Sequence, residues 1–218
     1  MGGLRNYLQR AMAPRAVVAL SRLPRTPWAA RKRVELYFAY DDPYAAVALP
    51  GLLRIVHARG APLSLYPLVE RGIAGDPAAE QRRAYAIMDA NRLAQRDGRR
   101  LSRKLPLTAG ECAFLAAWTE AARHDTGSAD FAAAVLEKLW FNSTGGVPRE
   151  ACAQLHRVHL HRDPPPDEAP WRQALARNAR RLRRKGHWES PAARVGGAWY
   201  FAHERLPQID ARLAALRR

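Results

Sequence analysis

Residues 33–44 read RVELYFAYDDPY, and this stretch decides how the chain begins to fold. Its first part, Arg33–Tyr40, is a short run rich in Val, Leu, Tyr and Phe, which is typical of a buried strand. Asp41 and Asp42 follow at once, and then Pro43. An Asp side chain caps a helix N-terminus well, and proline suits the first helical position because its missing N–H would be unpaired there anyway. The stretch therefore predicts a strand that turns directly into a helix.

The residues after this turn complete a strand–helix–strand unit. A helix is expected over roughly 44–58, and Gly60 should end it. Pro50 lies inside this range and predicts a kink or a restart of the helix. Residues 62–66 again have the composition of a strand, which Pro67 should end. Two strands joined by a helix in this way form a βαβ unit, which is parallel and right-handed.

The middle of the chain, residues 76–163, has no run with the composition of a strand. It contains four segments with helical character, which are residues 78–97, 109–123, 128–140 and 149–158. The second begins with Thr108 and has Glu111 three residues later, which is the pattern of a capping box. We therefore expect an all-α insertion over 76–163.

The last part of the chain returns to mixed structure. After the proline-rich linker 163–167 comes a basic helix that should end near Lys185. Two short strands are expected at 193–195 and 198–201, with Gly196-Gly197 as the two-residue hairpin turn between them, and a final helix at 204–216. The predicted fold class is therefore α/β: a thioredoxin-like fold built from 34–75 and 164–218, with the all-α domain inserted between the two halves.

The charge of the 218-residue chain is strongly positive. It carries 36 Lys and Arg against 20 Asp and Glu, a formal net charge of +16. Residues 1–33 contain no acid, and we interpret them as a basic N-terminal extension, with a transit-like or membrane-surface role as the alternative. The basic run at 172–185 also contains no acid, and it has three interpretations. It is a solvated helix face, a rim that binds anions, or a surface that contacts the phosphates of nucleic acid. Without zinc-finger or aromatic RNA-binding patterns, nucleic acid and anionic membranes are the less favoured partners.

Cysteine usage limits the chemistry. Only Cys112 and Cys152 occur, and there is no CxxC, which excludes a dithiol oxidoreductase. Two cysteines also do not make a disulfide framework, so we expect both to be buried thiols in a cytoplasmic protein. The histidines at 156, 159 and 161 lack a neighbouring Cys or carboxylate that would complete a metal shell, and no metal site is expected.

Three segments resemble one known family. YFAYDDPY, residues 37–44, is similar to the opening of DsbA-like thioredoxin-fold proteins, in the branch of the 2-hydroxychromene-2-carboxylate isomerases and kappa-class glutathione transferases, which read like FDFxSPYSY here. YAIMDANRLAQRDG, residues 85–98, resembles the first helix of their insertion domain. GHWESPAARVGGAWYFAHERL, residues 186–206, stands in the place of their cis-proline loop, hairpin and FWGxDRL-like segment. The resemblance covers about residues 34–216.

The resemblance implies glutathione as cofactor, a small substrate of the class of aromatic compounds, and a homodimer. Pro191 would be the cis-proline of the fold, and its neighbour Ser190 would offer backbone groups to a thiol peptide. Glu204 stands where relatives hold an Asp for the γ-glutamyl ammonium, and Arg205 follows in the matching place. Tyr44 matches the Tyr of the SPY motif; it could equally be a core aromatic residue.

Asp42 is the main departure from the family pattern. Relatives place there a Ser, whose hydroxyl can donate to a glutathione thiolate; an ionised Asp cannot donate and would repel the thiolate. The helix N-terminus is expected to keep the pKa of Asp42 low. In one interpretation Asp42 is only an N-cap, and the site is inactive or redirected. In the other it is a general acid or base paired with His187 or His203, each of which could otherwise be an exposed polar residue.

Three functions follow from these features. The first is a glutathione-dependent isomerase or transferase of small aromatic compounds. The alternative is a catalytically inactive or redirected binding or scaffold protein with a basic N-terminal extension. A hydrolase or lyase that uses Asp42 with a histidine is the least favoured, because no nucleophile elbow or triad pattern is present.

Overall fold

The structure is a computed structural model, and it describes residues 32–72 and 75–216. The predicted basic extension, residues 1–33, lies outside the described residues except for its last two.

The predicted βαβ unit is present. Strand β1 (Val34–Ala39) is buried along its whole length, helix α3 spans Pro43–Arg59, and strand β2 (Leu63–Leu68) pairs parallel to β1 with Val34 opposite Leu63. Asp42 is the N-cap of α3, and its side chain accepts a hydrogen bond from the backbone N–H of Tyr44. The buried strand and the capped helix that the opening residues predict are both confirmed.

The prediction for Pro67 is wrong, and one of the two alternatives for Pro50 is excluded. Helix α3 does not restart at Pro50 but continues through it to Arg59, whereas a kink at Pro50 stays a prediction. One side of α3 is buried over most of its length, and this packing outweighs the single hydrogen bond that Pro50 cannot donate. Strand β2 continues through Pro67 to Leu68. It is an edge strand, where a missing N–H can face away from the ladder, so a proline is tolerated.

The four predicted helices of the insertion are confirmed. They are α4 (Ala79–Arg96), α5 (Ala109–Ala121), α6 (Ser128–Trp140) and α7 (Arg149–Leu160). The capping box of Thr108 and Glu111 is formed. Trp118, Phe131 and Trp140 are fully or almost fully buried in a hydrophobic core that also contains the apolar side of α3. The core is thus shared between insertion and sheet, and the domain boundaries at 75 and 164 stay a prediction.

The remaining elements complete a four-stranded sheet. They are helix α8 (Ala169–Arg184), strands β3 (Ala192–Val195) and β4 (Ala198–Phe201), and helix α9 (Leu206–Ala215). Strand β3 runs antiparallel to both β1 and β4, and the strand order is β2-β1-β3-β4. Gly196 and Gly197, with φ of 53° and 88°, form the predicted hairpin turn.

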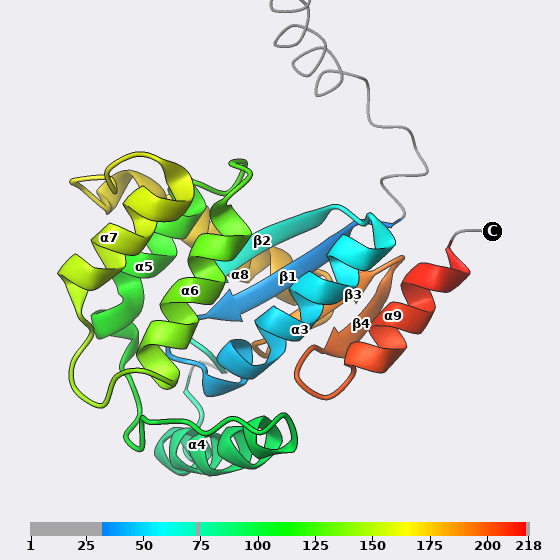
Figure 1. The fold of residues 1–218 in the computed structure, drawn as a ribbon, viewed down its shortest axis with the longest axis horizontal. Helices are drawn as coiled ribbons and strands as arrows, with labels where there is room; N and C mark the ends of the chain where they lie inside the picture. Colours follow the sequence, from blue (N-terminus) through cyan, green and yellow to red (C-terminus); the bar gives the residue numbers. More distant parts are fainter. Residues whose placement is uncertain (1–31, 73–74, 217–218) are drawn as a thin grey trace, which may run out of the picture. The chain divides into compact units, whose positions relative to one another are not determined.

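The helices cover the sheet on both faces. Figure 1 shows α3 and α9 on one face and α8 on the other, with the insertion helices beside the sheet. This order and layering are those of a thioredoxin-like fold with a helical insertion between β2 and α8, as predicted. Within the described ranges, no helix is long and apolar enough to cross a bilayer.

Candidate functional site

Asp42 is the centre of a buried hydrogen-bond network at the start of α3. Its side chain is completely buried. Oδ1 accepts the Tyr44 backbone N–H at 3.1 Å and lies 3.5 Å from Nη1 of Arg71. Oδ2 accepts the Ser190 hydroxyl at 2.7 Å, and the same hydroxyl accepts the backbone N–H of Ala39 at 3.1 Å. Both carboxylate oxygens are therefore already occupied by protein groups.

The network joins the N-terminus of α3 to the loop before the hairpin. The peptide bond between Ser190 and Pro191 is cis, and Ser190 is almost completely buried. The 2.7 Å hydrogen bond to Asp42 brings together two residues that are 148 positions apart in sequence. Asp42 and Ser190 are thus neighbours, as the resemblance implies.

Arg71 is a site residue that the sequence analysis missed. It follows β2, and its side chain is only 10 % exposed. Its backbone N–H donates to Asp41 at 3.1 Å, and its Nη2 lies 3.5 Å from Oε1 of Glu189. The guanidinium also lies 5.3 Å from the centroid of the Tyr44 ring. Arg71 is therefore a cation fixed over the site by carboxylates and an aromatic ring.

A positional signal could have identified Arg71. The chain is rich in arginine, so the residue type alone is uninformative. However, the carboxyl ends of the parallel strands β1 and β2 lie at the same edge of the sheet, with Ala39 opposite Leu68. Residues that directly follow these two ends, Asp41 and Arg71, are therefore brought together.

Burial changes the ionisation of the two carboxylates. It raises the pKa of Asp42 to about 6, although the Arg71 charge and the Ser190 hydrogen bond oppose the rise. Burial and the charge of Asp42 together raise the pKa of Asp41 to about 7. The expectation that the helix N-terminus keeps the pKa of Asp42 low is therefore wrong, because loss of hydration outweighs the helix end. Both acids can exchange a proton near neutral pH.

Arg71 remains the cation of the site. Burial alone would lower the pKa of its guanidinium, but Asp42 and Glu189 raise it by more. The site therefore holds a permanent positive charge in contact with acids that titrate near neutrality.

His203 packs onto the other side of the site through Tyr44. Its ring stacks on the Tyr44 ring at a centroid distance of 4.1 Å, while the Tyr44 hydroxyl donates to Asp89 at 2.9 Å. Burial, together with the charge of Arg71, lowers the pKa of His203 to about 4. His203 is therefore neutral at pH 7 and is not an exposed polar residue.

His187 is held in an aromatic cluster. It is 7 % exposed, and its Nδ1 accepts the backbone N–H of Glu189 at 3.2 Å. Its ring lies 4.9–5.3 Å from the ring centroids of Trp188, Trp199 and Phe201. Burial lowers its pKa. Among the contacts of the described residues, neither His187 nor His203 touches Asp42, so the predicted Asp–His pair is not formed.

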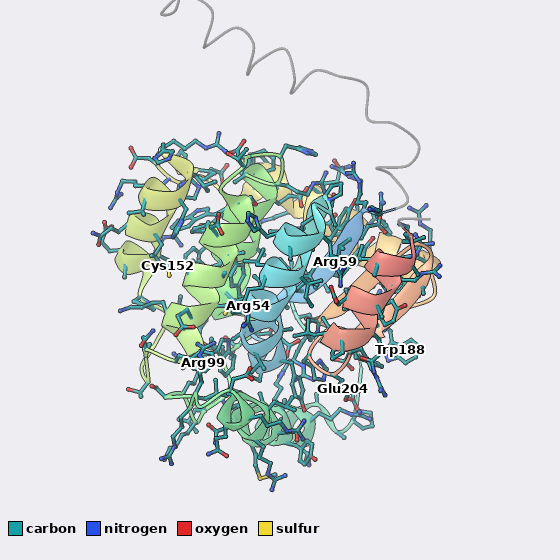
Figure 2. The ribbon with its side chains drawn as sticks, turned by 45° about the vertical axis from the view of Figure 1, so that its right-hand side comes forward. Arg54, Arg59, Arg99, Cys152, Trp188 and Glu204 are labelled. Atoms are coloured by element: carbon teal, nitrogen blue, oxygen red, sulfur yellow. The ribbon has the colours of Figure 1, made fainter. Side chains whose placement is uncertain are left out.

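Glu204 and Arg205 lie at the protein surface next to His203. The side chain of Glu204 is half exposed; its Oε1 lies 3.7 Å from Nε2 of His203 and its Oε2 lies 3.8 Å from Nε of Arg205. Figure 2 shows Glu204 and Trp188 on one side of the molecule and Cys152 on the other. Glu204 is thus accessible to a ligand that approaches this side.

A cavity of about 400 Å³ opens beside Arg71 and Glu189. Its remaining lining residues are Glu70, Gly72, Gly75, Asp76, Ala79, Arg82, Arg83 and Trp188. We call it the site cavity. Arg82 is paired with Asp76 at 2.7 Å, whereas Arg83 has no ion pair among the described residues. The cavity is therefore a polar chamber with arginines on several sides.

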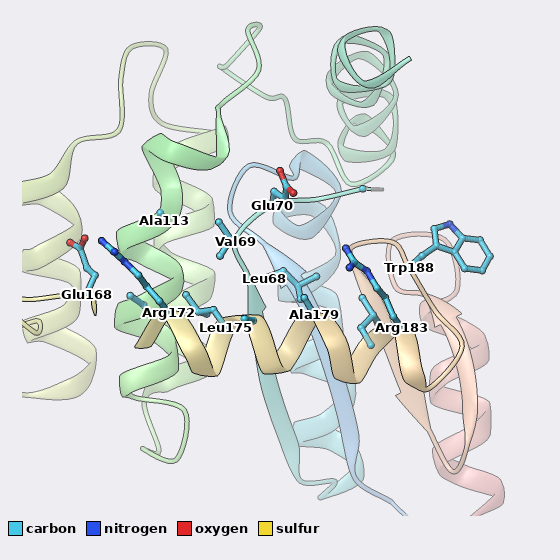
Figure 3. A pocket seen from close by; sticks show the side chains of 14 residues that line it. Leu68, Val69, Glu70, Ala113, Glu168, Arg172, Leu175, Ala179, Arg183 and Trp188 are labelled. Atoms are coloured by element: carbon cyan, nitrogen blue, oxygen red, sulfur yellow. The ribbon is translucent and has the colours of Figure 1, made fainter. Parts of the chain in front are cut away.

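An apolar groove adjoins the site cavity. It has a volume of about 400 Å³ and lies between α8, α5 and the end of β2, as Figure 3 shows. Leu175 and Ala179 of α8 and Ala113 of α5 contribute to its floor. Trp188, which is 53 % exposed, lines both the groove and the site cavity. A ligand with a charged end and an apolar body would find both surfaces next to each other.

The two cysteines take no part in the site. Both are free and buried, and burial raises the pKa of both thiols, that of Cys152 to about 11. His156, which belongs to the histidine cluster noted above, is buried, and its Nδ1 bonds to the carbonyl of Arg162. In the described part of the chain no group of three or more His, Cys, Asp or Glu could hold a metal.

Comparison with known proteins supports the fold. No family model matches the sequence, and no curated protein matches it significantly. Among solved structures, a 2-hydroxychromene-2-carboxylate isomerase superposes with a TM-score of 0.61 at 16 % identity, covering 85 % of this chain and 96 % of its own. A probable DsbA oxidoreductase from Streptomyces coelicolor superposes with a TM-score of 0.61 at 13 % identity. This match covers 85 % of the present chain and 89 % of the oxidoreductase. The fold is thioredoxin-like, of the DsbA type.

A third structure agrees. ScsC of Proteus mirabilis in a compact conformation has a TM-score of 0.51 at 12 % identity, covering 97 % of this chain and 99 % of its own. At these identities the likeness establishes the fold alone.

Proposed function

We propose that this protein is an isomerase or transferase for a small aromatic acid and that it uses glutathione as its thiol cofactor. The observation that carries the proposal is the guanidinium of Arg71, which is fixed by Asp42 and Glu189 and faces the site cavity. A fixed cation at the edge of a cavity is a receptor for a carboxylate or a thiolate. The isomerase of similar fold acts, by its name, on a carboxylate.

The neighbouring residues provide surfaces for both ligands. In the proposed arrangement the glutathione peptide lies along Ser190 and Pro191, and Glu204 pairs with its ammonium. Arg71 takes over the stabilisation of the thiolate, which a Ser hydroxyl provides in the proteins that this sequence resembles. Trp188 and the apolar groove accommodate the aromatic body of the substrate.

Ligand binding at Arg71 should be coupled to a proton. The positive charge of Arg71 lowers the pKa of Asp42. When a bound anion shares that charge, the pKa of Asp42 rises further above 6, so Asp42 takes up a proton from solvent at pH 7. Binding of an anion at Arg71 and protonation of the buried Asp42 are thus linked, and each favours the other.

A titration with glutathione tests the proposal. Glutathione at millimolar concentration should raise the melting temperature and shift the amide signals of residues around Asp42 and Ser190. Arg71→Gln should weaken binding by at least about tenfold, because a charge-assisted contact is lost. Arg96→Gln, an exposed arginine near the end of α4, is the control and should bind as the wild type does. The absence of any response in the wild type would overturn the proposal.

A second candidate function is favoured by one specific observation. Asp42 and Ser190 are 0 % and 1 % exposed, so both side chains are covered by other protein groups. A protein that binds a small acid at Arg71 without turning it over would fit this covered arrangement. An absorbance assay distinguishes the two candidate functions: the absorbance of 2-hydroxychromene-2-carboxylate is followed over time in the presence of the protein and glutathione. Turnover supports the enzyme, whereas ligand binding without turnover supports the binding protein.

A further inference from the structure

A second concave surface, away from the site cavity, is lined mainly by arginine. It has a volume of about 480 Å³, and its lining residues are Tyr66, Arg123, Arg177, Asn178, Arg180, Arg181 and Arg184. We call it the arginine hollow. Four of its arginines come from α8, at intervals that place them on a single helix face, and the fifth follows α5. None of its residues lines the site cavity, so this surface is independent of the proposed function.

Most of the positive charge in the arginine hollow is not balanced. Arg123 pairs with Glu120 at 2.9 Å, and Arg181 pairs with Glu35 at 2.5 Å. No acidic residue is among the lining residues. Three exposed arginines of α8 have no ion pair within the described residues, and these are Arg177, Arg180 and Arg184. Like charges three and four residues apart on a helix repel, and a bound anion would relieve that repulsion.

The two paired arginines are held in place by aromatic rings. Nε of Arg181 donates to the Tyr37 hydroxyl at 2.9 Å, and its guanidinium lies 4.7 Å from the centroid of Tyr66. Arg123 lies 5.3 Å from the same ring, which stacks on Tyr37. Because these two guanidinium groups are already ordered, a ligand would lose little entropy in ordering them.

The shape and charge of the arginine hollow select the ligand chemistry. At 1.5 Å rise per residue, the Cα atoms of Arg177 and Arg184 are about 10 Å apart along the helix axis. A single carboxylate would offset one charge only, whereas a short run of linked phosphates carries several charges over such a span. Guanidinium groups also bind phosphate oxygens in a bidentate manner. We propose that the arginine hollow binds linked phosphate groups, either in a free linear oligophosphate or in the backbone of a single nucleic-acid strand.

The test uses the full chain and two probes, inorganic tripolyphosphate and a fluorescently labelled single-stranded RNA of mixed sequence. The variant replaces all three unpaired arginines: Arg177→Gln, Arg180→Gln and Arg184→Gln. The control removes the same charge from exposed arginines on or just after α4: Arg92→Gln, Arg96→Gln and Arg100→Gln. Binding is measured at physiological and at high salt, and the Nε–H NMR signals of Arg123 and Arg181 report contact within the hollow.

We expect tripolyphosphate to bind with a stoichiometry of one and to shift both arginine signals. The hollow variant should lose at least about tenfold in affinity, because three charge-assisted contacts disappear together, and the control should lose less than about twofold. If the same variant weakens RNA binding and tripolyphosphate displaces the RNA, the natural source is a nucleic-acid backbone. If RNA binding is unaffected, the source is a free oligophosphate.

Two results would overturn the proposal. One is that neither probe binds saturably to the wild type at physiological salt. The other is that the hollow variant and the control weaken binding equally, because net charge alone would then account for the binding.

Discussion

Asp42 shows how burial can reverse an expectation based on local sequence. A carboxylate at a helix N-terminus is normally stabilised in its charged form. Here the side chain has lost all contact with water, and its pKa rises to about 6 even though Arg71, Ser190 and the Tyr44 N–H all favour the charged form. The same network that orders the site therefore makes its charge dependent on pH.

A pH-dependent stability difference follows for the two buried acids. The folded-state pKa values of Asp41 and Asp42, about 7 and about 6, lie above the unfolded value of 3.8. Their stabilising contribution is therefore complete below about pH 4 and is lost as pH rises through 6 to 7. The double variant Asp41→Asn, Asp42→Asn should gain on the order of 3–6 kcal/mol relative to the wild type between pH 4 and pH 8.

Urea unfolding at several pH values measures this difference. Comparison with the wild type cancels the contributions of other titrating groups, including the buried histidines, because both proteins contain them. A stability difference that does not change between pH 4 and pH 8 would show that the two acids are not perturbed by burial.

His203 should show the opposite pH dependence. Its folded-state pKa of about 4 lies below the unfolded value of 6.5, so its contribution is present above pH 6.5 and is lost as pH falls toward 4. His203→Phe keeps an aromatic ring against Tyr44 but cannot be protonated, so the variant does not lose this stability as pH falls. Between pH 7 and pH 5 the variant should gain on the order of 1–2 kcal/mol over the wild type in chemical unfolding. An equal loss of stability in both proteins would mean that His203 is protonated in the folded state.

At the scale of elements, the close contact between α6 and α7 explains why a glycine stands at position 127. A Cβ atom on Gly127, the N-cap of α6, would lie 1.9 Å from the backbone oxygen of His159 in α7. Gly127→Ala should therefore destabilise the protein by about 1–3 kcal/mol. Gly110 is the matched control, because it lies in the first turn of α5 with open space around it. Gly110→Ala should stabilise by about 0.5–1 kcal/mol.

Thermal unfolding of the two alanine variants tests the helix contact. The melting temperature should fall for the Gly127 variant and rise for the Gly110 variant. If both variants behave alike, the close approach of α6 and α7 is not rigid.

The sequence predicts the elements better than it predicts the site. Strand β1, its turn and the insertion helices depend on local patterns, such as the capping box of Thr108 and Glu111, which tertiary contacts leave unchanged. Pro67 was misjudged because its tolerance depends on β2 being an edge strand, which no local pattern reveals. Arg71 and the burial of His203 depend on contacts between distant segments. The resemblance identified Asp42 and Ser190, but only the packing shows what surrounds them.

At the scale of the whole molecule, the homodimer implied by the resemblance stays a prediction. Exposed apolar side chains such as Tyr85 and Met88, one helical turn apart on α4, are available for a contact between copies. Light scattering should give twice the mass of 24.4 kDa, and Tyr85→Glu with Met88→Glu should reduce it toward that mass if α4 forms the contact. A monomer mass for the wild type at micromolar concentration would contradict the prediction.

The coupling of anion binding to proton uptake most directly tests the central claim, namely that Arg71 and Asp42 act as one unit. Glutathione and glutathione sulfonate are titrated calorimetrically at pH 7 in two buffers of different ionisation enthalpy; the sulfonate carries a permanent negative charge in place of the thiol and has no proton to release. The account predicts that glutathione sulfonate binding takes up a fraction of a proton, at most about one per ligand, and that Asp42→Asn binds the ligand without this uptake. Proton uptake that is unchanged in Asp42→Asn, or no binding of either ligand to the wild type, would contradict the account.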